Sequence, residues 1–122
     1  MISREEFILD GIATFIENNY SDNVTRDRLA KRACMNKCKF SKVFNKRFGR
    51  NIKDYLNNIR MKKAAELLDN RDLRITDIAL SVGFGSIEHF TRVFKKTYNL
   101  SPREYRKNPI KLSTQYSLWN PD

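Results

Sequence analysis

The stretch KCKFSKVFNKRF, residues 37–48, decides the fold because the chain contains a second version of it. When the sequence is shifted by fifty positions, residues 40–49 (FSKVFNKRFG) align with residues 90–99 (FTRVFKKTYN). Aligned residues are alike in chemistry: Phe40 and Phe90, Lys42 and Arg92, Phe44 and Phe94, Phe48 and Tyr98. Upstream the shift falls to forty-nine, with residues 29–30 over 78–79. A supersecondary unit that occurs twice in 122 residues therefore sets the expected architecture.

Each copy reads as a short helix, a tight turn and a second amphipathic helix. In the first copy the short helix is predicted at 26–33, and Asn36 caps the next helix, which ends at Gly49. In the second copy the short helix is predicted at 77–82, Ser86 caps the next helix, and SPRE (101–104) starts a last one. The periodicity predicts an inward side in each main helix: Phe40, Val43, Phe44, Phe48 in one and Phe90, Val93, Phe94, Tyr98 in the other.

Two further helices complete the predicted all-α fold. Ser3 and Glu6 form a capping box before a helix whose apolar residues recur at helical spacing: Phe7, Ile8, Ile12, Phe15, Ile16. We expect this helix to pack over the core of the first copy, although its acidic face leaves a partner-binding role open. Asn51 caps a longer helix of about seventeen residues, which spans roughly 25 Å and ends at residues 69–70. It has the right length for a rigid linker between two small subdomains.

The charge of the chain predicts an anionic partner. The formal net charge is +10, and residues 26–63 hold fourteen basic residues against two acidic ones. A helix-turn-helix unit places its second helix in the major groove of DNA, and successive grooves on one face lie about 34–36 Å apart. Two such units joined by a linker helix therefore predict one chain that reads two half-sites of double-stranded DNA without a dimer. An RNA-binding or protein-docking helical module is the alternative that the same basic surface permits.

The segment RITDIALSVGFGSIEHFTRVFKKTYNLSPREYR, residues 74–106, resembles the signature of the AraC/XylS family of bacterial transcription regulators. The resemblance extends over about residues 5–107. It implies a DNA-binding domain of about seven helices with two homeodomain-like helix-turn-helix units, and a role as a transcription activator beside RNA polymerase. The implied DNA-binding domain covers residues 1–107, with subdomains at about 1–50 and 70–107 and a linker helix at about 51–69. Both a stand-alone regulator and the excised DNA-binding part of a longer one fit this pattern.

The resemblance also assigns base-reading positions. In the first unit they fall on Cys38, Ser41 and Lys42, with Asn45 one turn on, and in the second on Ile87, Glu88, His89, Thr91 and Arg92. Lysine and arginine donate to guanine, glutamate accepts from cytosine, asparagine suits adenine, and threonine and isoleucine suit the thymine methyl group. His89 adjoins the core residue Phe90, so packing or a phosphate contact is an alternative role for it.

Cations around these helices are predicted to contact DNA phosphates: Lys37, Lys39, Lys46, Arg50, Lys95, Lys96. Because Cys38 and Ser41 are small, the first unit is expected to depend more on phosphate contacts and DNA shape. For Lys53, Lys62 and Lys63 two interpretations are equally good: phosphate contacts, or charges that are simply solvated. Phe40, Phe44, Phe90 and Phe94 are assigned to the cores and not to base stacking.

Several other classes of protein are not indicated. The chain shows no nucleophile–base pair, no paired carboxylates in an apolar setting and no phosphate-binding glycine loop, so no enzyme is predicted. Cys34 and Cys38 with a single histidine do not supply a tetrahedral zinc site, and no metal or cofactor is expected. No leader or membrane segment is indicated, and two cysteines fit a reduced, cytoplasmic protein. Residues 108–122 are expected to form a loosely ordered tail.

One backbone position is predicted to be strained. Cys34 aligns with Gly83 in the turn between the paired helices. If the shared position requires a positive φ, the cysteine side chain costs of order 1 kcal/mol there.

Overall fold

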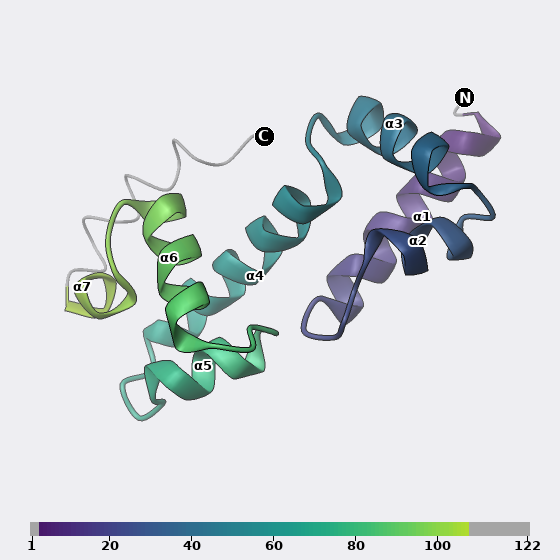
Figure 1. Ribbon diagram of the computed structural model, residues 1–122. Helices are drawn as coiled ribbons and strands as arrows, with labels where there is room; N and C mark the ends of the chain where they lie inside the picture. The colour runs from purple at the N-terminus through teal and green to yellow at the C-terminus, as the bar shows by residue number, and fades with distance from the viewer. Residues whose placement is uncertain (1–2, 108–122) are drawn as a thin grey trace. The chain divides into compact units, whose positions relative to one another are not determined.

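The computed structural model describes residues 3–107, and the expected C-terminal tail lies outside them. The described part is all-α, with seven helices and no strands. The helices are α1 (Arg4–Asn19), α2 (Arg26–Arg32), α3 (Lys37–Phe48), α4 (Ile52–Leu68), α5 (Ile75–Ser81), α6 (Ile87–Tyr98) and α7 (Pro102–Lys107) (Figure 1). The chain divides into two compact units, Met1–Ile59 and Arg60–Asp122, here called unit 1 and unit 2.

The helix boundaries follow the repeat in the sequence. α2 and α5 each have 7 residues and start 49 positions apart, and α3 and α6 each have 12 residues and start 50 positions apart. The predicted start of the short second-unit helix at residue 77 was therefore wrong by two residues. The N-cap of α5 is Arg74, whose side chain makes no capping hydrogen bond, so no capping residue in the sequence marks this boundary.

Side-chain caps fix most of the other helix starts. The hydroxyl oxygens of Thr25 and Ser86 and the side-chain carbonyl oxygens of Asn36 and Asn51 each accept a backbone N–H at 2.8–3.2 Å. The predicted capping box of Ser3 and Glu6 forms, and Ser101 and Glu104 make the same reciprocal pair of bonds at the predicted SPRE helix start. The N–H of the capping serine lowers the pKa of each glutamate, because it favours the ionised carboxylate.

The turn of each helix-turn-helix is closed in the same way. In unit 1 the N–H groups of Cys34 and Met35 donate to the carbonyls of Lys31 and Ala30, at 3.1 and 2.9 Å. The corresponding bonds after α5 measure 3.1 and 3.0 Å. This is the Schellman pattern, which needs one residue with positive φ. Cys34 holds that place with φ 58° and Gly83 with φ 108°, so the condition stated for strain at Cys34, a positive φ at the shared position, is met.

The core of unit 1 lies where α1 and α2 cover α3 (Figure 1). α1 contributes Leu9, Ile12 and Ile16, each at most 3% exposed. Phe7, expected on the packing side, is instead 69% exposed. Each residue of a helix is rotated by about 100° from the one before, so Phe7 lies on the opposite side of α1 from Leu9. The prediction failed because it counted Phe7 as part of the apolar stripe and omitted Leu9.

Four aromatic rings hold the second helix of each helix-turn-helix, α3 or α6 (here called the recognition helix for its predicted role), against the helix that follows it. In unit 1 this aromatic quartet is Phe40, Phe44, Phe48 and Tyr55, with centroid distances of 5.7 Å (40–44), 4.7 Å (44–48), 5.3 Å (44–55) and 5.2 Å (48–55). In unit 2 it is Phe90, Phe94, Tyr98 and Tyr105, and the matching distances are 5.8, 4.8, 5.4 and 5.6 Å. The contacts Phe44–Tyr55 and Phe94–Tyr105 are edge-on, with interplanar angles of 82° and 88°. The two units therefore share one packing solution.

α4 contributes to both cores. Ile52 and Leu56 near its start belong to the core of unit 1. Met61, Ala64 and Leu68 further along are fully buried in unit 2. At the end of α4 the guanidinium of Arg106 donates to the carbonyls of Leu68, Asn70 and Leu73 at 2.8–3.2 Å. Arg106 thereby fixes the loop that leads into α5.

Arg47 joins the recognition helix α3 to α1. Its Nε and Nη2 atoms donate to both carboxylate oxygens of Asp10 at 3.0–3.1 Å, and its Nη1 donates to Glu6 at 3.0 Å. The other oxygen of Glu6 accepts the N–H of Ser3. The Glu6 carboxylate therefore takes part both in the N-cap of α1 and in the ion pair with Arg47, here called the Arg47 clamp. Bidentate pairing of this kind orients two helices more strictly than a single point contact does.

We predict that Cys34→Gly stabilises the protein, because glycine adopts the left-handed conformation without the clash of a Cβ atom. The expected gain in the free energy of unfolding is about 0.5–1 kcal/mol, measured by urea denaturation with far-UV circular dichroism. The reciprocal variant Gly83→Ala should lose about 1–2 kcal/mol. A stabilising Gly83→Ala, or a destabilising Cys34→Gly, would show that the turn does not carry this strain.

Arg47→Ala is expected to lower the free energy of unfolding by about 1 kcal/mol at low ionic strength, since the ion pairs are partly exposed and screened by solvent. The loss should shrink in molar salt, while Lys42→Ala on the outer face of α3 should change stability little. If Arg47→Ala left stability intact but weakened DNA binding, Arg47 would be a phosphate contact and not a clamp.

Candidate nucleic-acid interface

The exposed face of α3 carries the four positions predicted to read bases in unit 1. Cys38, Lys42 and Asn45 are exposed and Ser41 is half-buried. They recur at the helical spacing i, i+3, i+4 and i+7, so they share one side of the helix. The opposite side is held in the core by Phe40 and Phe44, which are fully buried.

α6 presents the equivalent side of unit 2. Glu88, His89 and Arg92 are exposed, whereas Ile87 and Thr91 are half-buried. With a shift of fifty, Glu88 corresponds to Cys38, Thr91 to Ser41, Arg92 to Lys42 and Lys95 to Asn45. Lys42 of α3 and Arg92 of α6 thus occupy equivalent positions. Both side chains are exposed, and both can donate to a base edge or a phosphate.

His89 also makes a packing contact. Its ring lies edge-on to Phe84 with centroids 5.1 Å apart, and Phe84 in turn packs edge-on against Phe90 at 5.6 Å. The guanidinium carbon of Arg60 lies 5.5 Å from the centroid of the same Phe84 ring. Burial lowers the pKa of Arg60. These contacts support the packing role weighed for His89 and tie the start of α6 to the turn before it.

The predicted phosphate contacts divide into two kinds. Lys46, Lys95 and Lys96 are exposed near the C-terminal ends of α3 and α6. Lys37 and Lys39, at the start of α3, instead lie 3.3 Å from Asp27 and 3.7 Å from Glu5. These two pairs are well exposed, so their energies are small and a phosphate can compete for the lysines. The sixth, Arg50, is half-buried.

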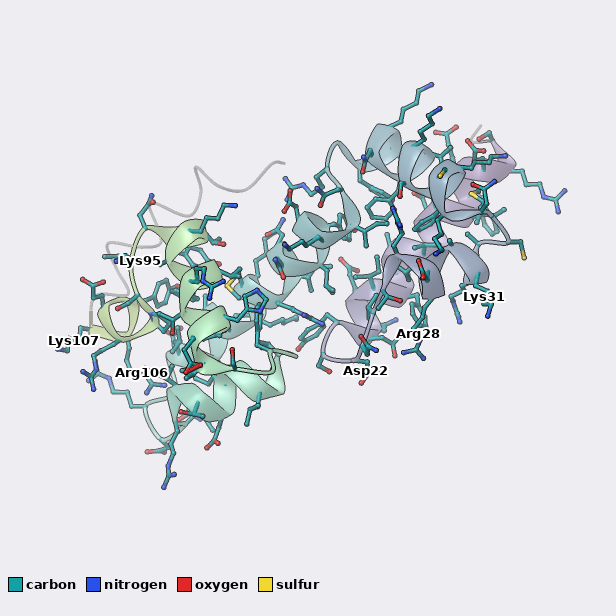
Figure 2. The ribbon with its side chains drawn as sticks, in the orientation of Figure 1. Asp22, Arg28, Lys31, Lys95, Arg106 and Lys107 are labelled. Atoms are coloured by element: carbon teal, nitrogen blue, oxygen red, sulfur yellow. The ribbon has the colours of Figure 1, made fainter. Side chains whose placement is uncertain are left out.

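A further group of cations was not singled out from the sequence. α2 carries Arg26, Arg28, Lys31 and Arg32, all exposed, in a helix of 7 residues. Figure 2 shows the labelled Arg28 and Lys31 side chains beside each other, with Asp22 nearby in the loop after α1. The signal in the sequence was the density of basic residues in 26–32, which was counted only in the total charge.

The described residues offer little for other chemistry. Residues 3–107 contain no group of three or more histidine, cysteine or acidic side chains placed to hold a metal ion. Within the same range no helix has the length and apolar character needed to cross a membrane. Cys34 and Cys38 are exposed free thiols.

Comparison with known proteins identifies the family. The profile of the family described as "Helix-turn-helix domain" matches residues 29–108. PqrA of Proteus vulgaris, named a probable transcription factor, is 33% identical over 101 residues, which cover 83% of this chain and 81% of PqrA. RhaS of Escherichia coli, named a transcriptional activator, is 29% identical over 99 residues. The chain spans 36% of RhaS, and it likewise spans only about a third of other curated relatives.

A solved structure gives the same result for the fold. The C-terminal domain of AraT, a response regulator from Geobacillus stearothermophilus, superposes with a TM-score of 0.80 at 31% identity. The superposition covers 86% of this chain and 88% of the other. The all-α fold with two helix-turn-helix units, predicted from the repeat and the resemblance, is therefore confirmed. The chain belongs to the AraC family of helix-turn-helix proteins, and the domain is that of a DNA-binding transcription regulator and not of an enzyme.

Proposed function

We propose that the chain reads two half-sites of one DNA duplex, with α3 in one major groove and α6 in the next. The observation that carries this proposal is the equivalence of the two outward faces. Each recognition helix is set on its own aromatic quartet, and each shows side chains at the same four helical positions. A protein that used one helix alone would not need a second copy with a preserved frame and a polar outer face.

The chemistry of the two faces assigns them different tasks. In unit 2, Arg92 donates to guanine O6 and N7, Glu88 accepts from the cytosine amino group, and Thr91 packs on a thymine methyl. In unit 1, Lys42 and Asn45 are the longer readers, and Cys38 and Ser41 are too short for most base contacts. Unit 2 therefore contributes most of the direct sequence discrimination. Unit 1 contributes affinity through phosphate contacts and DNA shape.

The remaining assignments complete the proposal. One chain carries both half-site readers, so it binds as a monomer, with residues 1–50 and 70–107 as DNA-binding subdomains joined by the linker helix. The naming of RhaS as an activator supports activation as the direction of regulation. Activation places RNA polymerase beside the bound protein, and a bacterial regulator of this kind acts in the cytoplasm on double-stranded DNA.

Arg92→Ala and Lys46→Ala separate base reading from phosphate binding. Arg92→Ala should cost about 1–3 kcal/mol on the preferred duplex and relax discrimination at one base pair. Lys46→Ala should weaken binding to every duplex alike and reduce the slope of log affinity against log salt by about one. Fluorescence anisotropy with a selected and a random duplex over a salt series measures both.

Arg71→Ala, which removes an exposed cation of the loop between α4 and α5, is the control and should leave the affinity for the preferred duplex nearly unchanged. Equal losses on selected and random DNA for Arg92→Ala would refute its role as a base reader. An affinity that does not change with salt would refute phosphate-dominated binding.

A further inference from the structure

An open groove of about 570 Å³ lies in unit 1 between the C-terminal half of α1, the loop that follows it and α2. We call it the α1–α2 groove. Its apolar residues are Phe15, Val24 and Leu29, and its cations are Arg28, Lys31 and Arg32. Its lining includes no residue of α3, so it is separate from the face that reads bases.

Two of the three cations, Arg28 and Arg32, are positioned by contacts with groups that are not acidic. The guanidinium carbon of Arg32 lies 4.0 Å from the centroid of the Phe15 ring, which is a close cation–π contact. Arg28 donates from Nη1 to the carbonyl of Asn23 at 2.8 Å. A side chain that is already ordered loses less entropy when it binds a ligand, so these arginines are prepared for an anionic group.

Nearby acids neutralise other cations. Asp27 pairs with Lys37, Glu5 with Lys39, and Glu6 and Asp10 with Arg47. One acid, Asp22, lines the α1–α2 groove beside the three cations. Figure 2 shows Asp22, Arg28 and Lys31 on the same side of the unit. The groove therefore keeps a positive field over an apolar floor.

The second unit shows that the fold does not require this surface. α5 occupies the place of α2 in the repeat and contains no basic residue in its sequence ITDIALS. Both helices brace a recognition helix through buried residues of the same positions, Leu29 and Ala30 in one and Ile78 and Ala79 in the other. The cations of α2 are thus an addition to unit 1 that the helix-turn-helix frame itself does not require.

We propose that the α1–α2 groove docks a segment of another protein in which acidic residues flank an apolar side chain. The apolar side chain packs on the half-buried Phe15 and Val24, and the acids pair with Arg28, Lys31 and Arg32. A DNA or RNA backbone offers phosphates for the cations but nothing apolar for the floor, so the floor favours a protein segment. The proposal does not depend on which bases the recognition helices read.

The test uses the full chain and two fluorescein-labelled peptides: leucine and phenylalanine flanked by aspartates, and the same peptide with serines in place of the aspartates. Anisotropy should show binding of the acidic peptide alone. Arg28→Ala and Arg32→Ala should each weaken it about tenfold, the effect of losing one charge-assisted contact. Arg26→Ala removes a cation of the same helix outside the groove and should change the affinity less than about twofold.

Amide NMR spectra of the complex should place the shifted resonances in α1 and α2, and Phe15→Ala should weaken the peptide while its spectrum stays that of a folded chain. If Phe15→Ala unfolds, Lys31→Ala takes its place: this residue is exposed, and its removal should also weaken binding of the acidic peptide. The proposal is overturned if neither peptide binds, if Arg26→Ala weakens the acidic peptide as much as Arg32→Ala does, or if the shifts centre on α3. It is also overturned if Arg28→Ala and Arg32→Ala weaken duplex DNA binding as strongly as peptide binding, which would make the groove a phosphate surface.

Discussion

The structure depends on one contact made twice, the edge-on packing of a tyrosine against the central phenylalanine of a recognition helix. Phe44 with Tyr55 and Phe94 with Tyr105 set the angle at which the next helix leaves, and the remaining rings fill the space around them. Edge-to-face pairs of this kind contribute about 0.5–1.5 kcal/mol beyond the area they bury. Because the rings occupy the inner side of α3 and α6, the outer sides are free to vary without changing the frame.

That freedom explains why the two units differ where they meet solvent. The ring-centroid distances of the two aromatic quartets are nearly equal, yet α2 is strongly basic and α5 is not. Arg47 ties α3 to α1, whereas its counterpart in the repeat, Thr97, is buried and donates to the carbonyl of Val93. The proposed function assigns different tasks to the outer faces of these two similar frames.

The repeat allowed most of the fold to be predicted, because a buried ring and a capping side chain each leave a local signal in the sequence. Leu9 and Phe7 were misplaced since two overlapping apolar patterns fit α1, and only packing chooses between them. The partners of Arg47 were not predictable, because Asp10 and Glu6 lie 37 and 41 positions away in the sequence. The α1–α2 groove was missed for the same reason: its floor and its cations come from separate segments.

Hydroxyl-radical footprinting on a duplex selected from random sequences tests the central claim, that two equivalent frames present two DNA-reading helices from one chain. The account predicts two protected stretches of backbone about ten base pairs apart, one helical turn of DNA. Substitutions on the outer face of α6 should remove one stretch and leave the other. The account would be contradicted by a single protected stretch that substitutions in one unit abolish and that substitutions in the other unit leave unchanged.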